Sequence, residues 1–327
     1  MPLEIIRNDI TKMNVDAIVN PTDPYFSGGG GVDEAIHFAA GLELFDECRS
    51  LGVCEAGQAK ITSGCDLDAK YVIHTVGPVW DGGESGEEEI LSSCYRNCFS
   101  LAVEVGIKRI AFPIISSGTF GYPKDLALET ATREIADFLN NHEMDVFLVV
   151  YDKETFRISD RLFYSVKQYI DDNFMEIMPV DPMVLYDMEP FREPSEICGY
   201  QRSLDDVLEQ LEDTFSQTLL RMIDEKGFTD VEAYKRANID KRLFSKIRSD
   251  VNYSPSKHNA LAFAIALELN LDETKDLLSR AGFTISNSIE SDLIVKYFIK
   301  QENYNIMKVN CVLFEYGQRQ LGSTVRA

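Results

Sequence analysis

One glycine-rich stretch decides how this chain folds: residues 17–37 read AIVNPTDPYFSGGGGVDEAIH. An apolar run ends in a proline-containing loop, four glycines follow, and a helical pattern begins at Gly31. Four consecutive glycines cost conformational entropy, so something near them should need exposed backbone amides. Phosphate is the natural candidate, and a flexible surface loop is the alternative. Neither the dinucleotide fingerprint GxGxxG nor the P-loop GxxxxGK[ST] fits this stretch.

A second strand, glycine loop and helix follow one another over residues 113–123, which read PIISSGTFGYP. Ligands bind at the carboxyl ends of parallel strands, so two glycine loops there can hold a diphosphate from opposite sides. Phe120 lies in this loop, and two interpretations stay open for it: a hydrophobic plug, or a wall for a sugar. Ser116 and Ser117 resemble nucleophiles only superficially, because no motif supplies a general base beside them.

Strands and helices alternate over residues 1–170. β-type runs at 17–20, 70–75, 109–115 and 146–151 alternate with helical spacing at 31–40, 92–105 and 125–140. This α/β pattern predicts a mainly parallel sheet that is covered by helices on both faces.

Length and composition point to two domains. The chain has 327 residues, of which 45% are hydrophobic, and domains usually contain about 100 to 200 residues. A formal net charge of −22 argues against non-specific binding to nucleic acid or anionic membrane, although it allows one local basic patch. No apolar run approaches the roughly 20 residues that span a bilayer, and the N-terminus lacks a signal pattern, so we expect a cytoplasmic protein.

The seven cysteines and four histidines predict free thiols and no metal site. An odd number of cysteines spread over a long chain does not suit a disulfide scaffold, and there is no CxxC pair. His37 and His74 are interpreted as packed side chains, and no cofactor is expected.

An acidic stretch separates the two predicted domains. Residues 171–213 contain thirteen acidic residues, two arginines and four prolines, which predicts a linker. A solvated spacer and an acidic docking segment are both compatible with this composition. After it, helical spacing with Ser256, Asp272 and Ser291 as candidate caps predicts an all-α domain over 214–327. The predicted helices are 214–226, 230–236, 241–248, 256–270, 272–280, 291–301 and 306–314.

The first domain resembles a macrodomain. Five motifs carry the resemblance in the family's order: DIT at 9–11, DAIVN at 16–20, GGGGVD at 28–33, YVIHTVGP at 71–78 and SSGTFGYP at 116–123. They are most similar to the MacroD-type branch, whose members bind ADP-ribose and often hydrolyse mono-ADP-ribosyl esters or O-acetyl-ADP-ribose. The resemblance implies a three-layer α/β/α sandwich with one mixed sheet over residues 1–170.

The resemblance also implies roles for single residues. Asp9, beside Ile10, matches the acid that accepts a hydrogen bond from the adenine amino group, and Tyr151 matches the aromatic residue that packs on adenine. Asp33 matches the catalytic aspartate, which orients or deprotonates a water that attacks C1 of the distal ribose or the acyl carbon. Taken alone, both aspartates also fit ordinary caps or turns. The other implied ligand-binding residues are Asn20, Gly29, Gly30, Gly31, Val32, Ser116, Ser117, Gly118, Thr119, Phe120 and Gly121.

One position departs from the family pattern. The family usually reads Val-Asn-Ala-Ala-Asn, whereas residues 19–23 read VNPTD, so Asp23 replaces an asparagine that normally touches the distal ribose. Aspartate lacks the amide's donors and adds negative charge near the diphosphate. We therefore expect weaker ADP-ribose binding, an altered substrate preference, or a second candidate base at Asp23. A non-catalytic ADP-ribose sensor is the alternative to a hydrolase.

Residues 229–250 of the second domain read helix, short turn, helix, which is similar to a repressor-like helix-turn-helix. From 229 to 257 there are seven basic and four acidic residues. The second of these helices could contact DNA through Lys241, Arg242, Lys246 and Arg248. A protein partner, dimerisation and a purely structural role are the alternatives.

Overall fold

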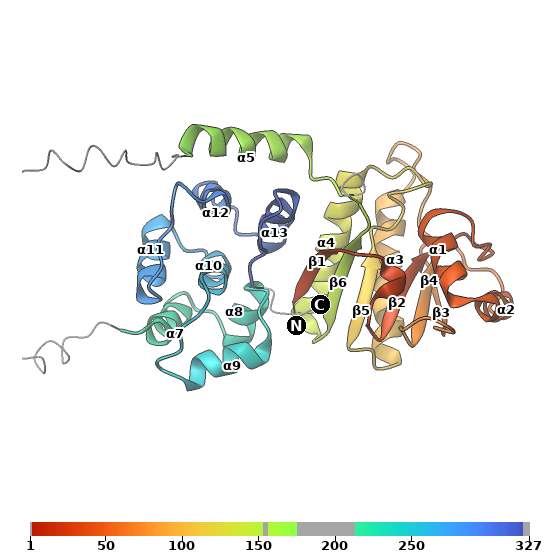
Figure 1. Ribbon diagram of the computed structural model, residues 1–327, viewed down its shortest axis with the longest axis horizontal. Helices are drawn as coiled ribbons and strands as arrows, with labels where there is room; N and C mark the ends of the chain where they lie inside the picture. The colour runs from red at the N-terminus through yellow and green to blue at the C-terminus, as the bar shows by residue number, and fades with distance from the viewer. Residues whose placement is uncertain (1, 153–155, 175–212, 323–327) are drawn as a thin grey trace, which may run out of the picture.

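A six-stranded sheet forms the centre of the first half in the computed structural model, which describes residues 2–152, 156–174 and 213–322 (Figure 1). The strand order is β1-β6-β5-β2-β4-β3, and only the edge strand β3 runs antiparallel to its neighbour. The strands are β1 (Leu3–Arg7), β2 (Ala17–Pro21), β3 (Ala59–Ser63), β4 (Tyr71–Thr75), β5 (Arg109–Pro113) and β6 (Asp145–Val150). The predicted mixed sheet is therefore confirmed.

Helices cover both faces of this sheet. In β6, Val146 and Leu148 belong to one apolar cluster, whereas Phe147 and Val149 belong to the other, as the two-residue period of a strand requires. The first cluster contains the buried sides of α3 (Glu87–Glu104) and α4 (Lys124–Asn141), and the second contains those of α1 (Gly31–Ala40) and α2 (Leu42–Ser50). The predicted three-layer sandwich is confirmed.

The second half of the molecule is all-helical over the described residues 213–322, as predicted. We call the helices of this range the helical half. Ser256 caps its helix, but Asn270 rather than Asp272 caps α11, because Asn270 is the residue with extended backbone before the first turn. The expected cap at Ser291 is also wrong, since α12 begins one residue earlier without a side-chain cap. The helices are α7 (Phe215–Glu225), α8 (Asp230–Arg236), α9 (Lys241–Ser249), α10 (Lys257–Ala266), α11 (Leu271–Arg280), α12 (Glu290–Lys300) and α13 (Ile306–Glu315).

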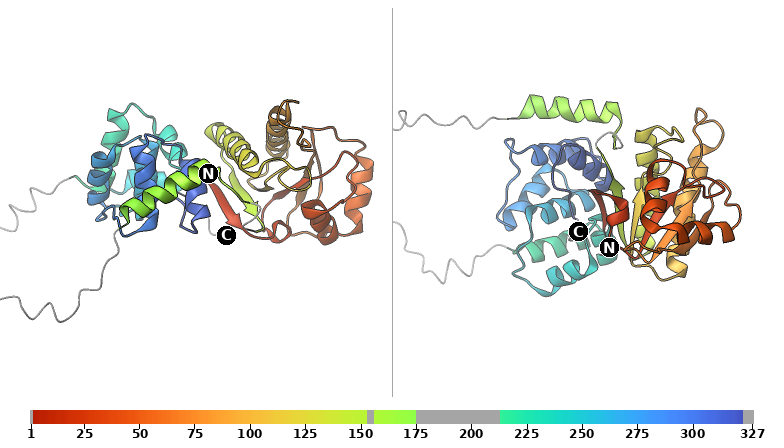
Figure 2. Two further views of the ribbon diagram at one scale, coloured as in Figure 1. Left: turned by 90° about the horizontal axis from the view of Figure 1, so that it is seen from above. Right: turned by 45° about the vertical axis from the view of Figure 1, so that its right-hand side comes forward.

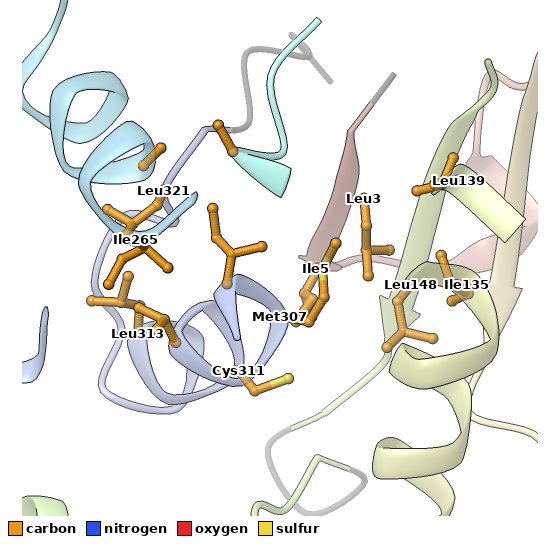
Figure 3. Packing of buried hydrophobic residues seen from close by; sticks show 14 of the residues in the cluster. Leu3, Ile5, Ile135, Leu139, Leu148, Ile265, Met307, Cys311, Leu313 and Leu321 are labelled. Atoms are coloured by element: carbon orange, nitrogen blue, oxygen red, sulfur yellow. The ribbon is translucent and has the colours of Figure 1, made fainter. Parts of the chain in front are cut away.

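The helical half packs against the edge strand β1. The side-chain amide of Asn238 accepts from Leu3 N at 2.8 Å and donates to Leu3 O at 2.9 Å. Gln320 does the same to Ile5, at 3.1 and 2.7 Å. Two side chains thus satisfy backbone groups that an open sheet edge would expose. Figure 3 shows Leu3 and Ile5 between Met307 of α13 on one side and α4 on the other. Leu3, Ile5, Met307 and the buried side chains of α4 belong to one apolar cluster.

Helix α5 (Asp160–Asn173) follows the last strand of the sheet in the sequence and packs on the helical half. It lies along the helical half (Figures 1 and 2), where Tyr169 meets Tyr297 edge to face with ring centroids 5.5 Å apart. The predicted domain boundary at residue 170 falls inside α5, and residues 175–212 of the predicted linker lie outside the described residues. The sequence patterns predicted neither α5 nor α2, β1 and β3.

Two further findings are limited to the described residues. None of the helices in that part of the chain combines the length and apolar character that crossing a bilayer requires. The six cysteines found there form no disulfide.

Candidate functional site

A cavity of about 560 Å³ lies at the carboxyl ends of the parallel strands. Pro21 at the end of β2, Pro113 at the end of β5 and Val149 near the end of β6 form part of its wall. The first turn of α1 lines the cavity as well. This is the edge at which open α/β sheets bind their ligands.

Most of the predicted site residues line this cavity. Asn20 does not, because it is fully buried beneath the cavity wall. Gly121 also lies outside the lining, in a turn where its N–H donates to Gly118 O at 3.0 Å. The predicted residues in the lining are Asp9, Ile10, Asp23, Gly29, Gly30, Gly31, Val32, Asp33, Ser116, Ser117, Gly118, Thr119, Phe120 and Tyr151.

The first glycine loop delivers the backbone to the cavity at the N-terminus of α1. Gly30 and Gly31 have φ of +83° and +63°, values that side chains other than glycine rarely adopt. A Cβ built on either residue would meet no atom within 4 Å, so close packing does not explain the glycines. Their exposed amides and the positive end of the α1 dipole instead favour an anionic ligand.

Asp33 lies in the first turn of α1 and is only 4% exposed. Its Oδ1 accepts a hydrogen bond from Asn20 Nδ2 at 2.7 Å. Its Oδ2 accepts from Thr22 Oγ1 at 2.9 Å and from Gly29 N at 3.2 Å. His37 Nε2 lies 3.4 Å from Oδ1 without forming a hydrogen bond to it. A carboxylate offers about four acceptor sites, so Oδ1, which accepts one hydrogen bond here, has the capacity to accept another.

A chain of hydrogen bonds supports Asp33 from beneath. His74 Nδ1 lies 3.2 Å from Asn20 Nδ2, and His74 Nε2 lies 2.9 Å from Thr62 Oγ1. Burial, with a smaller effect of His37, lowers the pKa of His74 to about 3, so the ring is neutral. Because Asn20 is the donor, we assign the ring proton to Nε2, and Asn20 is thereby fixed toward Asp33.

His37, Cys48 and His74 place their ligand atoms within 4.8 Å of one another. Burial, together with the negative charges of Asp33 and Glu47, raises the pKa of the Cys48 thiol to about 12. Both ring nitrogens of His74 already have partners, and a thiol is a poor metal ligand compared with a thiolate. This group therefore fits a packing role better than metal binding.

The second glycine loop forms the opposite wall. Ser116 has a φ of +62°, and its Oγ is buried against Gly77, with no hydrogen-bond partner among the described residues. A Cβ on Gly77 would lie 2.1 Å from that Oγ, which is why the loop can pack so closely there. Phe120 is partly buried, and its carbonyl accepts from Trp80 N at 2.9 Å.

Comparison with known proteins agrees with this geometry. The model of the Macro domain family matches residues 19–131. A macro domain-containing protein of Methanosarcina mazei is 52% identical over 155 residues, which are 47% of this chain and 83% of that protein. The chain belongs to the macrodomain family.

Two further matches concern the macrodomain. An O-acetyl-ADP-ribose deacetylase of Salmonella typhimurium is 49% identical over 166 residues, which are 49% of this chain and 93% of that protein. A solved structure of an Oceanobacillus iheyensis macrodomain with MES bound is 37% identical, with a TM-score of 0.47, and the match covers 51% of this chain and 93% of that one.

Asp23, the departure from the macrodomain pattern, holds its own loop. Its Oδ1 accepts from Tyr25 N at 2.8 Å, and its Oδ2 accepts from Ser27 N at 3.2 Å and from the Ser27 hydroxyl. Partial burial acts to raise the pKa of Asp23, but these hydrogen bonds outweigh it and lower the pKa. Both oxygens of Asp23 are thus engaged by residues of its own loop.

The other end of the macrodomain cavity is more open. Asp9 caps a short 3-10 helix, η1 (Ile10–Lys12), and its Oδ1 accepts from Thr11 N at 3.0 Å and Thr11 Oγ1 at 2.7 Å. Tyr151 follows β6 and is 72% exposed. The second oxygen of Asp9, Oδ2, forms a long ion pair with the exposed Lys12 at 3.9 Å, and most of the Tyr151 side chain is open to a ligand.

Several lining residues are not among those predicted from the sequence, and one of them, Thr22, contacts Asp33 directly. Its signal was available, because alternate residues of an extended strand face the same side, so Asn20 and Thr22 point alike. The missed residues are Asn8, Pro21, Thr22, Ala35, Gly77, Pro113, Ile114 and Val149.

The candidate DNA-contacting residues lie on α9, away from the cavity lining. Lys241, Arg242, Lys246 and Arg248 are all exposed, opposite the buried side of the helix. Two of them already have partners. Arg248 pairs with Asp230, and Lys246 Nζ lies 5.4 Å from the centre of the Tyr253 ring.

Proposed function

We propose that the macrodomain binds ADP-ribose and hydrolyses O-acetyl-ADP-ribose or mono-ADP-ribosyl esters on acidic side chains. The observation that carries this proposal is the buried Asp33 carboxylate, which faces the cavity beside the exposed amides of the glycine loop. The names of relatives support it, since proteins 45 to 49% identical to this chain are O-acetyl-ADP-ribose deacetylases. No metal takes part in the proposed step.

Each part of ADP-ribose has a suitable partner in the cavity. The amides of Gly30 and Gly31 at the start of α1 suit the diphosphate. The Asp9 carboxylate suits the adenine amino group, and the exposed Tyr151 ring suits the adenine ring. These placements put the distal ribose near Asp33.

Asp33 then acts on water. The remaining acceptor site of Oδ1 orients a water and takes its proton as the oxygen attacks. In the deacetylation reaction the water oxygen bonds to the acyl carbon, the bond from the acyl carbon to the ribose oxygen breaks, and Asp33 returns its proton to that oxygen. ADP-ribose and acetic acid, which ionises in solvent, then leave. Attack at C1 of the distal ribose is the alternative for protein esters.

Asp33→Asn tests this role, because the amide keeps the shape of the side chain but cannot accept a proton. We expect release of acetate from O-acetyl-ADP-ribose to fall at least about 100-fold. The dissociation constant for ADP-ribose, measured by calorimetry, should change less than about threefold. Glu34→Gln, at the exposed neighbouring position, is the matched control. Turnover of Asp33→Asn equal to that of the wild type would refute the proposed role.

A non-catalytic sensor is the second candidate function, and Asp23 favours it. Its charge lies at the wall of the same cavity, where the family usually has a neutral amide. ADP-ribose binding by calorimetry without turnover on either substrate class would establish the sensor.

For the helical half we propose contact with a macromolecular partner through the exposed cations of α9. DNA and an acidic protein surface are the two candidates. A shift of duplex DNA by the full chain that weakens with salt, and that is lost in Lys241→Glu/Lys246→Glu, would establish DNA. No shift at low salt would leave the protein partner.

We also propose that the protein works in the cytoplasm. The unpaired cysteines in the described parts of the chain suit a reducing compartment.

A further inference from the structure

Thr22 is held firmly at the floor of the cavity. It is 3% exposed, and it follows directly after β2. Its backbone N–H donates to Thr75 O, at the end of β4, at 2.9 Å, and its hydroxyl donates to Asp33 Oδ2 at 2.9 Å. The sheet therefore holds the backbone of Thr22 in place, and the Thr22 side chain donates a hydrogen bond to the Asp33 carboxylate.

This contact belongs to the part of the sequence that departs from the family. In place of Val-Asn-Ala-Ala-Asn the chain reads VNPTD, so Thr22 occupies a position where the family usually has alanine. Alanine has no hydroxyl. The Asp33 carboxylate in this chain thus gains a donor on Oδ2, opposite the Asn20 amide on Oδ1.

We propose that Thr22 is a positioning residue for Asp33: its hydroxyl fixes the direction in which the carboxylate faces the cavity. Donors on both oxygens prevent rotation of the carboxylate about its Cβ–Cγ bond. The inference rests on the proposed function, because it names a residue that serves the same site.

The neighbours of Asp33 explain why this donor matters. Asp23 brings a second carboxylate to the cavity wall, and a bound diphosphate would add more negative charge beside Asp33, so the direction in which the Asp33 carboxylate points has to be fixed by donors. His37 of α1 lies 3.4 Å away, but burial lowers its pKa against the opposing effects of Asp33 and Asp23. His74 of β4 is neutral, and Cys48 of α2 remains a thiol. Besides Thr22, Asn20 and Gly29 are then the donors that stabilise the charged carboxylate.

The test compares Thr22→Val, which removes only the hydroxyl, with Thr22→Ser, which restores it. Two readouts are needed: kcat and KM for O-acetyl-ADP-ribose, measured separately, and the carbon-13 NMR signal of the Asp33 carboxyl at pH 7.5. We expect the carboxyl signal to shift in Thr22→Val, because the hydroxyl donor on Oδ2 is lost. We also expect kcat to fall about tenfold, with KM changing less than about threefold, and Thr22→Ser to return toward the wild type in both readouts.

Thr132→Val controls for the loss of a buried threonine hydroxyl, because the Thr132 hydroxyl bonds within α4, to Leu128 O at 2.8 Å and Glu129 O at 3.1 Å. An unchanged Asp33 carboxyl signal in Thr22→Val would overturn the inference. If Thr22→Val fails to fold, Thr22→Ala makes the same comparison with the residue that the family carries. The NMR readout needs no turnover, so an inactive wild type refutes the proposed hydrolase and leaves the inference to be decided by the carboxyl signal.

Discussion

The two ends of the cavity are held in place by different parts of the molecule. At the Asp33 end, the supporting polar side chains Asn20, Thr22 and His74 are at most 3% exposed and bond to one another or to Asp33 within the macrodomain. At the open end, Tyr151 is 72% exposed. The segments that lead to the open end contact the helical half.

These contacts flank both sides of the open end. The Arg7 guanidinium at the end of β1 lies 5.8 Å from the centre of the Phe314 ring in α13. Phe156, five residues after Tyr151, meets the same ring edge to face, with centroids 4.7 Å apart. The end that performs the chemistry is thus built locally, whereas the end proposed for adenine depends on contacts between distant parts of the chain.

The largest effect is expected at the Asp33 end, from Gly30→Glu. A side chain on Gly30 would extend into the cavity and place a negative charge at the proposed diphosphate site. We expect ADP-ribose affinity, measured by calorimetry, to fall at least about 1000-fold, which is about 4 kcal/mol. Gly52→Glu is the matched control: its φ is +66°, a Cβ there also meets nothing within 4 Å, and it does not line the cavity. Full affinity in Gly30→Glu would refute the placement of the diphosphate.

The second largest effect is expected from Asn238→Ala, at the contact between β1 and the helical half. Asn238→Ala removes two hydrogen bonds and leaves the buried N–H and C=O of Leu3 without partners, so we expect the free energy of unfolding to fall by about 3 kcal/mol. Urea denaturation measures this change. Asn238 has a φ of +54°, so Asn238→Gly separates the lost hydrogen bonds from backbone strain. An unchanged free energy in Asn238→Gly would show that β1 is held without this amide.

The comparison also explains which features could be predicted. The glycine loops, Asp33 and the helices of the helical half follow from short motifs, caps and periodicity, and these are properties of neighbouring residues. Asn238 is 235 positions from Leu3, and nothing around it marks a partner at that distance. Strand β1 is equally inconspicuous, because it is five residues long and lies at the edge of the sheet.

Thr22 shows a second limit of prediction from the sequence. The departure from the family pattern at 19–23 predicted an effect of the Asp23 charge, whereas in the structure the hydroxyl of Thr22 contacts Asp33. Two facts that only the folded chain supplies decide this: α1 brings Asp33 over the end of β2, and Asp23 turns to Ser27 and Tyr25.

The Asp33 end should also be the acid-sensitive one, because His74 is buried and neutral. Its pKa is about 3 in the folded chain and about 6.5 in the unfolded chain, so between these values only the unfolded state binds the proton. Stability is therefore lost as the pH falls below 6.5. At pH 5 we expect a loss of about 2 kcal/mol relative to pH 7.5 from this residue. His74→Gln should lack this part of the pH dependence in urea denaturation, and an identical dependence in both proteins would contradict a buried neutral His74.

The smallest effect is expected at the open end, from Tyr151→Ala. The side chain is mostly exposed, so its loss should leave the free energy of unfolding unchanged. Stacking of a base on an aromatic ring contributes about 1 to 3 kcal/mol, and high exposure favours the lower value, so ADP-ribose affinity should fall about fivefold. Tyr25→Ala is the matched control, since Tyr25 is 77% exposed and does not line the cavity. Ribose 5-phosphate, which lacks adenine, should bind the wild type and Tyr151→Ala equally. A similar loss for both ligands would mean that Tyr151 shapes the whole cavity, and the distinction between its two ends would fail.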